Sequence, residues 1–116
     1  MDVTVAQITM ERRTDEVIVH PYGDVDTATA GALSLVLDQA MMQGRRVVVD
    51  LEDVTFIDAR GIATVLEAAQ TLTDRGGGLG VRAASATVAR VFEQLGGEIP
   101  LDSISTRSDG ASPMPA

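Results

Sequence analysis

Residues 47–66 read VVVDLEDVTFIDARGIATVL, and this stretch decides the fold. It opens with three consecutive valines, a continuous β-branched run that predicts a strand covered on both faces. A short loop follows, and Asp58 then occupies the position of a helix N-cap. Beyond the cap, apolar residues recur at the spacing i, i+3, i+4, i+7, at Ile62, Val65, Leu66 and Ala69. The stretch therefore predicts a buried strand that leads into an amphipathic helix, with no catalytic residue after the cap.

Two further segments repeat this helical spacing. One comprises Leu33, Val36, Leu37 and Ala40, and the other comprises Val88, Val91, Phe92 and Leu95. Asp26 or Thr27 is expected to cap the first of these helices, and Gly44 to end it. Gly96 and Gly97 are expected to end the last one.

Short apolar runs between these helices predict strands at residues 5–10, 17–19, 79–81 and 99–101. Pro100 places the last of them at a sheet edge. Helices that alternate with short strands indicate a single α/β domain with a mixed sheet and helices packed on it. We expect the domain to span residues 1–102 and to be followed by a flexible tail, residues 103–116, which is rich in Ser, Gly and Pro.

Composition excludes several classes of function. Aromatic residues make up 3% of the 116 residues, so the core has to be aliphatic. There is no Cys and only one His, which excludes disulfides, thiolate metal sites and multi-histidine metal sites. The net charge of −8 argues against nucleic acid and anionic lipid as partners and fits a basic patch on another protein. We expect no cofactor.

The location is expected to be cytoplasmic. The first residues, Met1-Asp2-Val3-Thr4, lack the charged and apolar regions of a secretory signal. No run of 18 apolar residues is present, so membrane insertion is not expected either.

The segment Asp58-Ala59-Arg60-Gly61 resembles the signature of STAS domains, the family of bacterial anti-sigma factor antagonists. In that family an Asp precedes a small hydroxyl residue, a second small residue, a Gly and an apolar helix. Gly23-Asp24-Val25-Asp26 is similar to the family's Gly-acidic-apolar-Asp segment beside that signature. The resemblance implies a mixed, mainly parallel sheet of four to five strands with helices packed on it. It also implies a partner-binding surface at Asp24, Asp58, Ala59, Arg60 and Gly61.

Ala59 occupies the position at which the family carries the hydroxyl that a partner kinase phosphorylates. The resemblance implies that the unmodified form binds the anti-sigma factor, a serine-protein kinase of the histidine-kinase-like ATPase type, and so regulates transcription. Ala59 has no oxygen to accept a phosphoryl group, so the chain is expected to bind permanently or to be regulated by another route. Thr55 and Thr64 are the alternative phosphoacceptors.

Arg60 and Gly61 of the Asp58–Gly61 segment, and Asp24 of the Gly23–Asp26 segment, have two interpretations each. Arg60 opposes the helix dipole, so either Asp58 or Glu67 neutralises it or it contacts an acidic group on the partner. Gly61 either allows a close approach or is a plain choice that costs about 1 kcal/mol relative to Ala. Asp24 is either a partner contact or part of a turn. For Asp26 we favour the N-cap interpretation, and the pair of carboxylates is a weak metal candidate.

Other motifs are expected to be structural. His20, next to Pro21, has no nucleophile in a recognisable motif, and the Gly76–Gly80 run lacks the Lys-Ser/Thr ending of a phosphate loop. No nucleophile–base pair is present, so the chain is not expected to be an enzyme. The alternative function, also implied by the resemblance, is a small STAS-type accessory subunit of a phospholipid-transport ABC complex.

Overall fold

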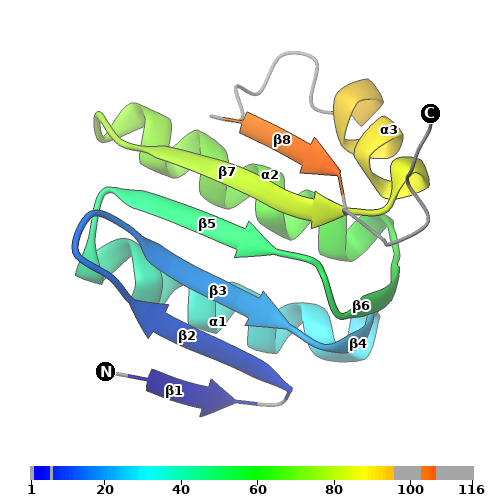
Figure 1. The fold of residues 1–116 in the computed structure, drawn as a ribbon, viewed down its shortest axis with the longest axis horizontal. Coiled ribbons are helices and arrows are strands. Elements are labelled where there is room, and N and C mark those ends of the chain that lie inside the picture. Colours follow the sequence, from blue (N-terminus) through cyan, green and yellow to red (C-terminus); the bar gives the residue numbers. More distant parts are fainter. Residues whose placement is uncertain (1, 6, 96–102, 107–116) are drawn as a thin grey trace, which may run out of the picture.

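The computed structural model describes residues 2–5, 7–95 and 103–106. Three helices and eight strands follow one another along this part of the chain (Figure 1). In order they are β1 (Asp2–Val5), β2 (Ile8–Arg12), β3 (Val17–Pro21), β4 (Gly23–Val25), α1 (Thr27–Gln43), β5 (Arg46–Asp50), β6 (Val54–Ile57), α2 (Ala59–Asp74), β7 (Gly78–Ala84), α3 (Ala86–Leu95) and β8 (Ser103–Thr106). All three predicted helices are confirmed.

The main sheet has the strand order β1-β2-β3-β5-β7-β8. Strands β1, β2 and β3 pair antiparallel, whereas β3, β5, β7 and β8 pair parallel. The predicted α/β class with a mixed, mainly parallel sheet is therefore confirmed. The sheet has six strands, more than the four to five expected, because a separate β1 pairs with β2 and Ser103–Thr106 adds β8. Gln7, with φ of 68°, lies between β1 and β2, where we expected one continuous strand.

Helices α1 and α2 lie on one face of this sheet, and α3 packs against β7 and β8 (Figure 1). Alternate residues of β3 and β5 point toward the helices, because side chains alternate across a strand. Val47 and Val49 of β5 are fully buried and belong to the same hydrophobic core as Leu33 of α1 and Val65 of α2. Val48 points to the other face and is only half-buried. The expectation that this strand is covered on both faces is therefore wrong.

A second, two-stranded parallel sheet pairs β4 with β6. We expected a loop before Asp58 and considered a turn at Asp24, and neither expectation anticipated these short strands. β4 has only three residues, of which Gly23 and Asp24 are poor strand formers, so it lacks the run that predicts a strand. The four residues of β6, Val-Thr-Phe-Ile, all favour a strand, but the segment is short and lies within the loop that we expected.

The C-terminal expectations have different outcomes. Ser103–Thr106 forms β8, although we expected the flexible tail to begin at Ser103. The strand predicted at residues 99–101 and the helix stop at Gly96 and Gly97 lie outside the described residues. The remainder of the predicted tail, residues 107–116, lies outside them too.

Candidate functional site

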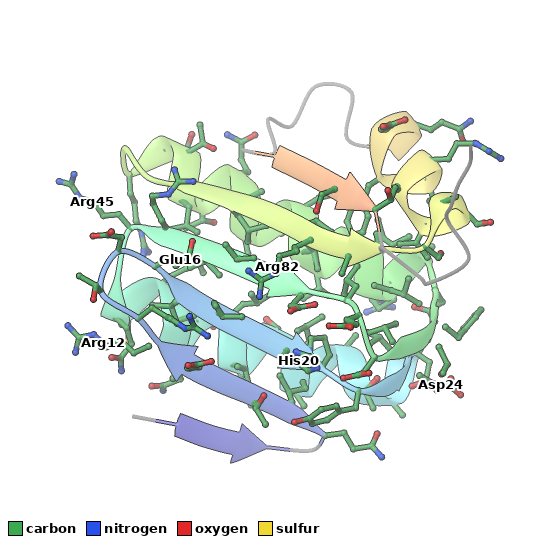
Figure 2. All side chains as sticks on the ribbon, viewed as in Figure 1. Arg12, Glu16, His20, Asp24, Arg45 and Arg82 are labelled. Carbon is green, nitrogen blue, oxygen red and sulfur yellow. The ribbon has the colours of Figure 1, made fainter. Side chains whose placement is uncertain are left out.

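Both long helices begin at the same edge of the small sheet. Strands β4 and β6 are parallel neighbours, so their C-terminal ends meet at one edge, and each strand leads directly into a helix. The Asp58 N–H donates a 3.0 Å hydrogen bond to the Val25 carbonyl and so ties the start of α2 to the end of β4. Asp24 lies at this end of the molecule (Figure 2). The fold thus brings the two sequence motifs, residues 23–26 and 58–61, to one rim.

Acidic side chains cap both helices. Asp58 Oδ1 accepts a 3.0 Å hydrogen bond from the Gly61 N–H, as predicted for an N-cap. Asp26 Oδ1 accepts from the N–H groups of Ala28 and Thr29, and the Thr29 hydroxyl accepts from the Asp26 N–H. This capping box confirms the N-cap interpretation of Asp26. Within the described part of the chain, no group of three or more His, Asp or Glu side chains is arranged to hold a metal ion.

Ala59 and Arg60 occupy the first positions of α2, and both are exposed. Among the described residues, the Arg60 guanidinium forms no ion pair with Asp58 or Glu67. Neither carboxylate therefore neutralises it, as one of our interpretations required. A cation at an exposed helix N-terminus costs roughly 0.3–1 kcal/mol. Arg60 thus presents a positive charge at the rim that has no ion-pair partner among the described residues.

Gly61 is buried one position further along α2. A Cβ atom at this residue would lie 2.8 Å from Val25 Cγ1 and 2.9 Å from Ile57 Cγ1. Both distances are far below ordinary van der Waals contact, so the close-approach interpretation is confirmed. Its neighbours are β4 and β6 of the same chain. Gly61 therefore supports the rim from inside rather than presenting a surface to a partner.

Two hydroxyls near the rim are engaged in hydrogen bonds. Thr55 Oγ1 donates to Asp24 Oδ1 at 2.7 Å, and Thr64 Oγ1 donates to the Arg60 carbonyl at 2.9 Å. Asp24 and Thr55 are both exposed. The sequence interpretation of Asp24 as a residue of this rim is consistent with its position, but its carboxylate also has a partner within the chain.

Phe56 is a rim residue that sequence reasoning missed. It is 53% exposed, although strand periodicity would place it on the same buried face as Val54. The pairing shifts between Gly23 and Asp24, so that Thr55 is an extra residue in β6. Such a bulge breaks the alternation of the strand and turns the aromatic ring outward. The sequence feature that could have drawn attention to Phe56 is the rarity of aromatic residues, since it is one of only three in the chain.

A polar cluster lies on the open face of the main sheet, where His20 and Arg82 point away from α1 and α2 (Figure 2). His20 Nε2 lies 2.8 Å from Asp53 Oδ2, and His20 Nδ1 lies 3.7 Å from Asp50 Oδ2. The Arg82 guanidinium donates to Asp50 Oδ2 at 2.9 Å. The expectation that His20 is structural agrees with this network, which ties the loop after β5 to β3 and β7.

Asp50 is the buried member of this cluster. Burial alone would raise its pKa, but the hydrogen bonds from Arg82 and the Glu52 N–H, with the charges of Arg82 and His20, outweigh it and hold the pKa below the ordinary 3.8. A lowered pKa in the folded state means that the carboxylate stabilises the fold above pH 3.8 and that this contribution is lost as the pH falls through the folded value.

We therefore expect Asp50→Asn to lower the free energy of unfolding at pH 7 by about 1–2 kcal/mol, since it weakens the hydrogen bonds to Arg82 and Glu52. The loss should shrink as the pH falls below 3.8 through the lowered pKa of the folded state, because the wild-type carboxylate then becomes protonated. Urea denaturation at pH 7 and in this acidic range measures this, with Asp15→Asn, at an exposed residue outside the cluster, as control. An equal loss at both pH values would contradict the role assigned to the charge.

A protein family model and several solved structures are similar to this chain. The family model, described as Mlab, STAS domain, matches residues 8–101. No curated protein matches the chain. Among solved structures, a putative anti-sigma factor antagonist from Thermotoga maritima superposes with a TM-score of 0.74 at 19% identity, covering 90% of this chain and 91% of that one.

Two further structures show the same fold. An anti-sigma factor antagonist from Mycobacterium paratuberculosis has a TM-score of 0.71 at 20% identity, with 88% of this chain and 90% of that chain covered. The Bacillus cell fate determinant SpoIIAA, in its phosphorylated form, has a TM-score of 0.68 at 20% identity, with 90% and 95% covered.

These likenesses concern the fold, because the identities are low. The match of the family model spans most of the chain, including β2 to α3 and both rim motifs. Among the described residues, no helix has the length and apolar character needed to cross a membrane. The chain belongs to the STAS domain family.

Proposed function

We propose that this protein is an anti-sigma factor antagonist that binds an anti-sigma factor of the serine-kinase type. Its binding surface is the docking rim, which we define as Asp24, Thr55, Phe56, Ala59 and Arg60. The observation that carries the proposal is that Ala59 is exposed at the first position of α2. In related antagonists this position holds the hydroxyl that the partner kinase phosphorylates, so it lies within reach of that partner.

The chemistry of Ala59 supports a rim that is permanently competent to bind. A phosphate at this position would add about −1.5 to −2 charges to the surface. Alanine has no oxygen that could receive a phosphoryl group, and it adds no charge. The rim therefore keeps the character of the unmodified state, in which the family binds its anti-sigma factor. The proposed site of action is the bacterial cytoplasm, where it regulates transcription through this binding.

Two rim residues indicate which chemical groups the partner surface should present. Arg60 is exposed and has no ion-pair partner in the part of the chain that the structure describes, so its positive charge fits an acidic group on the partner. Phe56 exposes an aromatic ring, the type of residue that contributes most to protein interfaces when it enters a pocket. The proposed contact therefore combines an apolar pocket with an acidic group beside it.

Arg60→Ala tests this chemistry. We expect it to weaken binding to the anti-sigma factor about tenfold, because a charge pair at the interface is lost. Arg75→Ala is a matched control, since Arg75 is an exposed arginine at the opposite end of α2. Isothermal titration calorimetry of both variants measures the difference. Equal affinities for the two variants would remove Arg60 from the interface.

The second candidate is a small accessory subunit of a phospholipid-transport ABC complex, in which the same helix start contacts the ATPase. The description of the matched family supports it, because that description names Mlab and not an anti-sigma factor. Titration of the purified protein against an anti-sigma factor kinase and against an ABC ATPase separates the two candidates. We expect binding to the kinase, and binding to the ATPase alone would establish the second candidate.

A further inference from the structure

A groove lies at the end of the molecule opposite the docking rim. It opens between the turn that joins β2 to β3 and the link from α1 to β5, and its volume is about 530 Å³. We call it the arginine groove, because it is lined by Arg12, Arg13, Arg45 and Arg46. Arg12 and Arg45 mark this end of the molecule in Figure 2, whereas Asp24 of the docking rim lies at the other end.

The arginine groove concentrates positive charge in an acidic protein. Four of the nine arginines of the chain line it, but only two of the seventeen acidic residues do, Asp15 and Glu16. All four arginines are exposed, and Glu16 is half-buried. The local charge is therefore positive, although the chain carries a net charge of −8.

Two of these arginines lack a partner of opposite charge within the described part of the chain. Arg13 Nε lies 3.0 Å from Glu11 Oε2 and is thus paired. The guanidinium groups of Arg12 and Arg45 form no ion pair with any described residue. A guanidinium presents its N–H donors in a planar fork that fits a carboxylate or a phosphate. Arg12 and Arg45 are therefore available to bind an anion from outside the chain.

The backbone holds these two arginines in fixed places. Arg12 is the last residue of β2 and pairs with Val17 of β3. The Arg45 carbonyl accepts a 2.9 Å hydrogen bond from the Gly78 N–H, and a Cβ atom at Gly77 would collide with the same carbonyl. Only β3 lies between β2 and β5 in the sheet, so these two strands are about 10 Å apart. The groove therefore presents two arginines at a set spacing.

We propose that the arginine groove binds a short acidic segment of a partner protein, with one carboxylate on Arg12 and another on Arg45. Side chains on one side of an extended peptide recur about every 7 Å, and arginine side chains are long enough to meet two such carboxylates from strands about 10 Å apart. Thr14 and Gln43 also line the groove, and their side chains can form hydrogen bonds with the backbone of such a peptide.

The surroundings of the groove favour a short peptide over other anions. A nucleic acid or an anionic membrane extends beyond the groove and meets the acidic remainder of the protein, which repels it. None of the ten residues that line the groove is aromatic, so the base of a nucleotide finds no ring on which to stack. A short acidic segment contacts the positive groove alone.

This surface is separate from the docking rim, so the inference does not depend on the proposed function. Because the two surfaces lie at opposite ends of the molecule, both can be occupied at the same time (Figure 2). The protein would then connect the partner of its rim to a second, acidic partner.

Fluorescence anisotropy of a fluorescein-labelled hexaglutamate peptide, titrated with the full chain at low ionic strength, tests the proposal. We expect the peptide to bind and its affinity to fall as salt is added. Arg12→Gln and Arg45→Gln should each weaken binding about threefold, and the double variant about tenfold. Arg90→Gln removes the same charge from an exposed site on α3 and should bind like the wild type. Binding that these groove variants leave unchanged, or that Arg90→Gln weakens as much, overturns the proposal.

A purely structural role of the arginines has its own readout. Gln43 and Gly44 end α1 at this groove, so arginines beside them also lie near the negative end of the helix dipole. Urea denaturation of the same variants measures that effect. A loss of stability without a loss of hexaglutamate affinity would reduce the arginines to this role and overturn the proposal. Tighter binding of pyrophosphate or of a single-stranded DNA hexanucleotide than of hexaglutamate would also overturn it, because the groove would then select another kind of anion.

Discussion

Ala59→Asp is expected to weaken binding to the anti-sigma factor by about 100-fold or more, because like charges brought together at an interface cost several kcal/mol. The substitution places a fixed negative charge at the first position of α2, beside Arg60. An acidic group of the partner that meets Arg60 would then face a carboxylate as well. Titration calorimetry at physiological salt measures the loss.

An effect of Ala59→Asp on binding can be distinguished from an effect on folding. An acidic residue in the first turn of a helix is favoured by the helix dipole, so Ala59→Asp should leave the free energy of unfolding unchanged or slightly raised. Ala59→Ser is the neutral control, and it should bind like the wild type as long as it is not phosphorylated. If Ala59→Asp binds with wild-type affinity, residue 59 lies outside the interface.

Gly61→Val is expected to lower the free energy of unfolding by about 3 kcal/mol, the upper range for overpacking a buried site. The first added carbon would already lie 2.8 Å from Val25 Cγ1 and 2.9 Å from Ile57 Cγ1. Both neighbours are buried and β-branched, so neither side chain turns away easily. The start of α2 would have to move away from the small sheet. Urea denaturation measures the effect.

The two helical glycines offer a matched comparison. Gly61→Ala and Gly31→Ala make the same chemical change inside a helix, and helix propensity favours alanine in both by up to about 1 kcal/mol. Only at Gly61 does the added carbon meet other atoms. We expect Gly61→Ala to destabilise the fold and Gly31→Ala to stabilise it. Stabilisation by both substitutions would mean that the contact at Gly61 relaxes without cost.

Local signals in the sequence were sufficient for the helices. Caps and apolar spacing predicted α1 from Asp26 to Gly44 and the start of α2 at Asp58, because both signals arise from residues close in the chain. The rim motifs were also recognised at residues 23–26 and 58–61. Gly61 was rightly expected to permit a close approach.

Features that depend on pairing between distant segments were missed. The small sheet forms because β4 pairs with β6, about thirty residues away in the sequence, and the three-residue β4 shows no strand pattern by itself. The bulge at Thr55, which exposes Phe56, arises only from that pairing. In the same way, His20 looked isolated in sequence, whereas the sheet brings it beside Asp50 and Asp53. The open face of the main sheet was missed for the same reason. It results from α1 and α2 both packing on the opposite face, which local sequence patterns do not specify.

The most direct measurement is binding of the anti-sigma factor kinase to the wild type and to Ala59→Ser, each with and without ATP, with mass spectrometry of both proteins afterwards. If Ala59 leaves the rim permanently available, ATP does not weaken wild-type binding through any phosphate on this protein. Ala59→Ser should acquire a phosphate at residue 59 and release the kinase. A wild type that is released by ATP with a phosphate on Thr55 or Thr64 would contradict this, because the rim would then have a working switch.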